Sequence, residues 1–170
     1  MSTDDARTGD WHDRAARLWD SFDEYTEQGF LDAMDRLTAE LPEGSALAAY
    51  ERGGAYDSTG RTELAIPLYR QALATGLDAS RRRQATIQLA SSLRALGEVE
   101  ESVRLLETER EAASDELDDA VVAFLALALT DAGREREAVS LALTALAGHL
   151  PRYARSMTAY AAMLGAPAAD

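Results

Sequence analysis

The stretch Gly60-Arg-Thr-Glu-Leu-Ala-Ile is repeated twice further along the chain, as Gly97-Glu-Val-Glu-Glu-Ser-Val and as Gly133-Arg-Glu-Arg-Glu-Ala-Val. Each copy contains a glycine, then charged or polar residues, then a small residue followed by a β-branched one. The three glycines lie 37 and 36 residues apart. A fixed period of this length is typical of repeat architectures, in which copies of one unit stack on each other.

Each glycine is flanked on both sides by apolar residues at the spacing of an amphipathic helix. Around Gly97, Leu89 and Leu93 precede the glycine, and Val103 and Leu106 follow it. A glycine is expected at the turn because the residue after a helix commonly adopts a left-handed conformation, which costs other residues about 1 kcal/mol or more. The small residue five positions later lets two antiparallel helices approach closely. Every unit is therefore predicted to be a helix, a tight turn and a second helix.

Three such units resemble the tetratricopeptide repeat (TPR) between roughly residues 45 and 150. Gly53 and Tyr56 have the spacing of the family's Leu-Gly-x-x-Tyr, with Arg52 where leucine is usual, and Glu109 replaces a usual alanine in the second unit. The resemblance implies an all-α fold, a right-handed superhelix of antiparallel helix hairpins. The expected repeats are 45–78, 79–114 and 115–150.

The segments outside these repeats are also predicted to be helical. Residues 10–44 form a divergent hairpin in which Trp11 and Leu18 share one helical face, Gly29 breaks the chain and Pro42 ends the second helix. Residues 151–165 are expected to form a capping helix over the last repeat. Nine helices are expected in total, with residues 1–9 and 166–170 as disordered tails.

Composition excludes several classes of function. The chain has 170 residues and a formal net charge of −13, with no cysteine, and all 17 basic residues are arginine. Disulfides, thiolate metal sites, cysteine nucleophiles, Schiff-base lysines and P-loops are therefore excluded. The negative charge disfavours nucleic acid and anionic lipid as partners. The chain has neither a signal-like start nor an apolar run of about 18 residues, so we expect a cytoplasmic location.

In a TPR-like array the first helix of each unit lines a concave groove, which usually binds an extended peptide or a helix of a partner protein. Projection outward from the core predicts eight partner-binding residues: Trp19, Tyr50, Gln84, Ile87, Gln88, Ser91, Arg94 and Leu127. Trp19, Tyr50 and Arg94 are the expected energetic anchors, because large aromatic side chains and arginine dominate interface energies.

A cluster of three arginines, Arg81 to Arg83, begins a predicted helix, where cations oppose the helix dipole. In one interpretation these arginines pair with acidic side chains of adjacent helices. In the other, Arg82 and Arg83 are an anion contact for an acidic partner segment.

Catalytic and metal-binding patterns are poor. His12 and His149 lie at opposite ends of the array, and no phosphate loop or nucleophile motif is present. We therefore predict no enzyme activity, metal or cofactor. The chain is predicted to be a noncatalytic scaffold that binds a protein or peptide partner, or a second copy of itself. The alternative is a regulatory domain that senses a peptide or small ligand in the groove.

Overall fold

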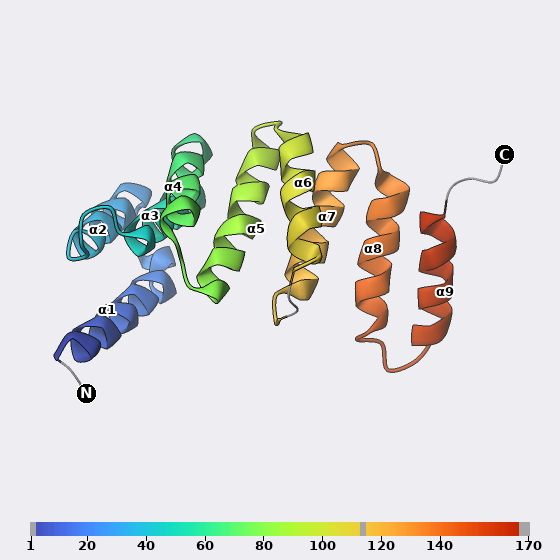
Figure 1. The fold of residues 1–170 in the computed structure, drawn as a ribbon, viewed down its shortest axis with the longest axis horizontal. Coiled ribbons are helices and arrows are strands. Elements are labelled where there is room, and N and C mark those ends of the chain that lie inside the picture. The colour runs from blue at the N-terminus through green and yellow to red at the C-terminus, as the bar shows by residue number, and fades with distance from the viewer. Residues whose placement is uncertain (1–2, 113–114, 167–170) are drawn as a thin grey trace. The chain divides into compact units, whose positions relative to one another are not determined.

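A computed structural model describes residues 3–112 and 115–166, with side chains from residue 10 onward (Figure 1). These residues form an all-α repeat fold with nine α-helices, one short 3-10 helix and no strand, which confirms the predicted fold class. The chain divides into two compact units, Met1–Asp78 and Ala79–Asp170. The division falls between the first and second predicted repeats.

The first unit contains four α-helices and the 3-10 helix: α1 (Thr3–Asp20), η1 (Phe22–Glu24), α2 (Glu27–Thr38), α3 (Ala46–Ser58) and α4 (Thr62–Thr75). The second unit contains five: α5 (Ala79–Ala95), α6 (Val99–Arg110), α7 (Asp118–Asp131), α8 (Glu135–Ala147) and α9 (Ala154–Gly165). Within the second unit, consecutive helices from α5 to α9 pack against each other, and α5 also contacts α7.

The three repeated glycines end the first helix of each repeat in the predicted way. Gly60, Gly97 and Gly133 have φ angles of 73°, 87° and 72°. The residue after each glycine donates its backbone N–H to a carbonyl five residues earlier, and the glycine N–H bonds the carbonyl three residues earlier. These bonds satisfy carbonyls that the helix end would otherwise leave unpaired. The small residues five positions later, Ala65 and its two counterparts, are buried.

The N-terminal hairpin differs from the prediction at two places. Gly29 does not break the chain; it lies inside α2, and the break runs from Ser21 to Thr26 through η1. Thr26 caps α2, because its hydroxyl oxygen accepts a hydrogen bond from the Gly29 N–H at 3.1 Å. The first helix also begins at Thr3, inside the predicted tail of residues 1–9, since no proline interrupts the helical backbone there. Residues 1–2 and 167–170 of the predicted tails lie outside the described residues.

Each unit has its own apolar core. In the first unit α1 packs on α2, and the Trp11 indole N–H donates to the Leu37 carbonyl at 2.9 Å. In the second unit α5, α6, α7 and α8 enclose a cluster centred on buried leucines such as Leu106 and Leu125. The helix α9 packs on α8, where the Ser140 hydroxyl donates to the Ala161 carbonyl at 2.7 Å.

Candidate functional site

Two rows of uncharged side chains lie on α5 and α7, two helices that contact each other, and we call these rows the α5–α7 face. On each helix the row follows an i, i+4, i+7 spacing, which places its members on one side of the helix. The α7 row contains Leu127, an apolar side chain that is 49% exposed. The face consists of Gln84, Gln88 and Ser91 on α5 and of Ala123, Leu127 and Thr130 on α7.

Ion pairs at both ends hold the two helices of this face in register. Arg94 Nη1 lies 2.8 Å from Asp131 Oδ2, and Arg83 Nη2 lies 2.7 Å from Asp118 Oδ1. Between these pairs, Ile87 packs into the core. The face is therefore built on two helices that are already packed against each other, which lowers the ordering cost of binding.

Two predicted groove residues belong to this support. Ile87 is buried in the core cluster of the second unit, so its assignment to the groove was wrong. Ile87 lies on the side of α5 that faces α7, together with Arg83, Ala90 and Arg94. The neighbouring side of α5 carries Gln84, Gln88 and Ser91. Arg94 is partly exposed, but its guanidinium is bound to Asp131 of the same chain.

The arginine cluster pairs with acidic side chains of neighbouring segments. Arg82 donates two hydrogen bonds to the Glu109 carboxylate, at 2.9 and 2.7 Å, and these bonds raise the pKa of the Arg82 guanidinium. Arg83 is only 3% exposed; it contacts Asp115 at 2.6 Å, Asp118 at 2.7 Å and the buried Glu109 at 3.5 Å. An external anion cannot reach Arg83, so the anion-contact hypothesis is corrected for this residue. Glu109, at a position where the family usually has alanine, was the sequence signal for this network.

Trp19 and Tyr50 belong to the first unit and are half-buried there. The Trp19 indole N–H donates to Glu51 Oε2 at 2.7 Å, and its ring centroid lies 5.0 Å from that of Phe30. A Cβ atom on Gly54 would lie 3.1 Å from the Trp19 ring, so α1 and α3 are tightly packed at this point. Trp19 therefore joins helices of its own unit rather than standing free as an anchor.

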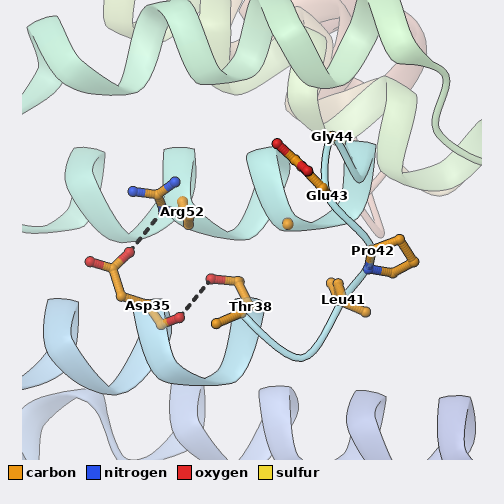
Figure 2. Close-up of a pocket in the computed structure, with 9 residues that line it drawn as sticks. Asp35, Thr38, Leu41, Pro42, Glu43, Gly44 and Arg52 are labelled. Atoms are coloured by element: carbon orange, nitrogen blue, oxygen red, sulfur yellow. Dashed lines mark hydrogen bonds and ion pairs between the residues drawn. The ribbon is translucent and has the colours of Figure 1, made fainter.

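A shallow hollow of about 520 Å3 lies where α2 ends and α3 begins, as Figure 2 shows. Its wall includes Asp35 and Arg52, joined at 2.8 Å between Oδ1 and Nε, and the turn formed by Pro42 and Gly44. The Thr38 hydroxyl donates to the carbonyls of Met34 and Asp35. Sequence reasoning missed this hollow, although Arg52 in place of the family's leucine marked its position. None of the predicted groove residues lines it.

The described residues contain no group of three or more side chains that could hold a metal ion. His149 Nε2 lies 2.8 Å from Asp119 Oδ2 at the surface, and the His12 ring stacks edge-on against Trp11. The His149 ring therefore pairs with a carboxylate in the first turn of α7. Within the described part of the chain, no helix has the length and apolar character needed to cross a bilayer.

Comparisons with known proteins agree with this architecture. Residues 46–164 match the family model described as Tetratrico peptide repeat. Two similar crystal structures are of the nearly identical TPR-like repeats of a candidate kinesin light chain from Podosopora anserina. The first, of a form with a single substitution, has a TM-score of 0.67 at 21% identity and covers 96% of this chain and 89% of its own. The second has a TM-score of 0.66 at 22% identity, with coverages of 93% and 86%.

At these identities the two structures establish the fold alone. The comparison with curated proteins found no match. The TPR fold is generally a module for protein–protein interaction. The family model spans well over half of the sequence, from α3 to α9, and the chain belongs to the tetratricopeptide repeat family.

Proposed function

We propose that the chain is a noncatalytic interaction module that binds an extended peptide or a helix of a partner protein along the α5–α7 face. The observation that carries this proposal is Leu127, a half-exposed apolar side chain on α7, which the Arg94–Asp131 ion pair joins to α5. An exposed leucine in this setting fits an apolar anchor of a partner, while the side-chain amide of the exposed Gln88 fits a peptide backbone.

The absence of charge on the face also defines the partner. The chain carries a net charge of −13, yet the six side chains of the α5–α7 face are all uncharged. The charged groups at its border, Arg94 and Asp131, are paired with each other. We therefore expect the bound segment to contribute an apolar side chain and backbone hydrogen bonds rather than a charged anchor.

The ligand-sensing alternative would be favoured by an enclosed pocket lined by Trp19, Tyr50 and Arg94. Trp19 is bonded to Glu51 and Arg94 to Asp131, and the hollow between α2 and α3 involves none of the three. The interaction module is therefore the better-supported function. Its cytoplasmic location stays a prediction from composition.

A peptide-display library that tiles the proteome of the source organism tests this proposal. We expect enriched peptides with an apolar residue in a shared position, and we expect Leu127→Asp to weaken their binding tenfold or more, which is about 1.4 kcal/mol. Leu146→Asp is the matched control, because Leu146 on α8 is 50% exposed and lies outside the face. Fluorescence anisotropy with the enriched peptides measures both affinities.

Equal loss of affinity in the two variants would contradict the assignment to this face. Peptides that bind the Leu127→Asp variant as well as they bind wild type would contradict it too.

A further inference from the structure

The outward flank of α9 carries large apolar side chains that the packing against α8 does not cover. Tyr153 is 77% exposed, Tyr160 is 65% exposed and Met163 is 71% exposed. Ser156, Tyr160 and Met163 follow the spacing i, i+4, i+7 and lie on one side of α9, while Tyr153 is the residue that precedes the helix, with a left-handed φ of 67°. We call these four residues the α9 stripe. Large apolar side chains that gather on one exposed side of a helix mark an interaction surface.

Charge indicates which partner the stripe can accept. Residues 138–169 contain no aspartate or glutamate, although the whole chain has 30 acidic residues against 17 arginines. Two copies of so acidic a chain repel each other wherever carboxylates would face one another. The α9 stripe combines large apolar side chains with the longest acid-free stretch of the sequence, so this repulsion is weakest here.

The order of side chains along the stripe is self-complementary. In an antiparallel pair of α9 helices, related by a two-fold axis at the level of residue 158, Ser156 of each copy lies opposite Tyr160 of the other. Tyr153, directly before each α9, is then at the level of Met163 of the other copy. The first pairing sets a small side chain against a large one, and the second sets a thioether against an aromatic ring, which is a favourable contact. Both pairings occur twice, as an isologous interface requires.

We propose that the α9 stripe is the interface of a homodimer in which two α9 helices pack antiparallel. Each α9 has 12 residues, so the two helices bury less than the roughly 1,200 Å2 of a standard stable interface. The dimer is therefore weak and reversible. Such a dimer presents every other binding face of the chain twice, which raises its avidity for a bivalent partner.

Sedimentation velocity over a range of protein concentrations tests the association. The wild-type mass is expected to rise from the monomer toward twice that value. Tyr160→Glu brings two carboxylates toward the two-fold axis and should raise the dissociation constant about tenfold or more. Leu64→Glu is the control, because Leu64 on α4 is also a half-exposed apolar residue and should leave the association unchanged.

Cysteine cross-linking tests the antiparallel register, since the natural chain has no cysteine. A Ser156→Cys copy mixed with a Tyr160→Cys copy should form a mixed disulfide faster than either variant forms a disulfide with itself. Only the mixed pair lies at the same level along the two helices, within the Cα separation of about 7 Å that a disulfide allows. Ala74→Cys, at an exposed alanine of α4, gives the rate of random collision.

A wild-type chain that stays monomeric at every concentration would overturn the proposal, as would a dimer that survives Tyr160→Glu. If Tyr160→Glu fails to fold, the cross-linking rates decide, and a mixed disulfide no faster than the Ala74→Cys rate overturns the proposal.

Discussion

At the scale of single residues, Gly53 of α3 lies against the ring of Tyr69 on α4. A Cβ atom on Gly53 would come within 3.0 Å of Tyr69 Cδ1 and Cε1, and this ring is fully buried. The backbone of Gly53 is ordinary α-helix, so its conformation does not require glycine. The close approach of Tyr69 on the neighbouring helix does.

Gly53→Ala should lower the free energy of unfolding by about 1 kcal/mol or more, since the overpacking exceeds the gain in helix propensity. Urea unfolding followed by circular dichroism measures the change. Gly148→Ala is the control, because Gly148 has a φ of −62° and a Cβ there would make only an ordinary contact. A more stable Gly53→Ala variant would show that Tyr69 can move aside.

The Tyr69 hydroxyl has no hydrogen-bond partner among the described residues, and burial, aided by the negative charge of Asp57, raises its pKa. A raised pKa means that the folded state holds the proton more tightly than the unfolded state. The protonated Tyr69 hydroxyl therefore favours the folded state. Its contribution to the free energy of unfolding is complete below the unfolded pKa of about 10 and is lost as the pH rises above it.

Tyr69→Phe should therefore match or exceed the stability of wild type at pH 7 and should lose less stability above about pH 10. Thermal unfolding between neutral pH and about pH 11 measures the difference. Tyr160→Phe, at an exposed position, should follow the wild-type curve. Identical alkaline profiles for Tyr69→Phe and wild type would contradict the assignment.

Glu109 is a buried carboxylate between Arg82 and Arg83. Glu109→Gln should destabilise the second unit by about 3 kcal/mol, because it removes the buried carboxylate that bonds Arg82 and lies beside the buried Arg83. Glu107→Gln removes a half-exposed partner of Arg134 and should cost about 1 kcal/mol or less. Chemical unfolding of both variants gives the comparison, and equal small losses would mean that Asp115 and Asp118 alone neutralise the two arginines.

At the scale of the helical elements, each hairpin depends on a small buried residue where its two helices meet. Ala65 lies between α3 and α4, which are packed against each other. Ser102 and Ala138 have the corresponding positions in the next two repeats, and both are buried. The turn glycine sets the direction of the second helix, while the small residue sets how closely the helices approach.

Ala65→Leu should lower the free energy of unfolding by about 1–3 kcal/mol, because the added side chain has no space at the helix contact. Ala74→Leu makes the same change at an exposed position of α4 and should be nearly neutral. Differential scanning calorimetry distinguishes the two, and an unchanged melting temperature for Ala65→Leu would contradict close packing at this position.

At the scale of the whole molecule, the net charge of −13 is the dominant electrostatic property. Many arginines are paired with carboxylates, as in the contacts of Arg14, Arg52 and Arg134 with neighbouring segments, yet acidic residues remain in excess. Exposed ion pairs contribute little each, whereas the repulsion among the excess carboxylates acts over the whole chain.

Raising the ionic strength from about 0.01 to 0.15 M shortens the screening length from about 30 to 8 Å and should therefore raise the melting temperature. The double variant Asp20→Asn, Glu111→Gln removes exposed negative charge near the C-terminal ends of α1 and α6 and should respond less to salt. Melting curves at both ionic strengths measure the response. A melting temperature that falls with salt would mean that the ion pairs outweigh the repulsion.

The hairpins, their glycine turns and their small contact residues could be read from the sequence, because helical periodicity and left-handed turns are local properties. The start of a helix was harder to predict where a capping residue and a glycine lie close together in the sequence. Thr26, rather than Gly29, sets the start of α2 in this way.

The sequence by itself determined that this chain is an all-α array of TPR hairpins, since a period of 36 to 37 residues leaves few other folds. Only the tertiary structure decided which residues of the first helices are open to a partner. Ile87 and Arg83 became buried because α7, a full repeat later in the chain, packs over them. Exposure is set by neighbours distant in sequence, and a helical projection of one segment does not contain those neighbours.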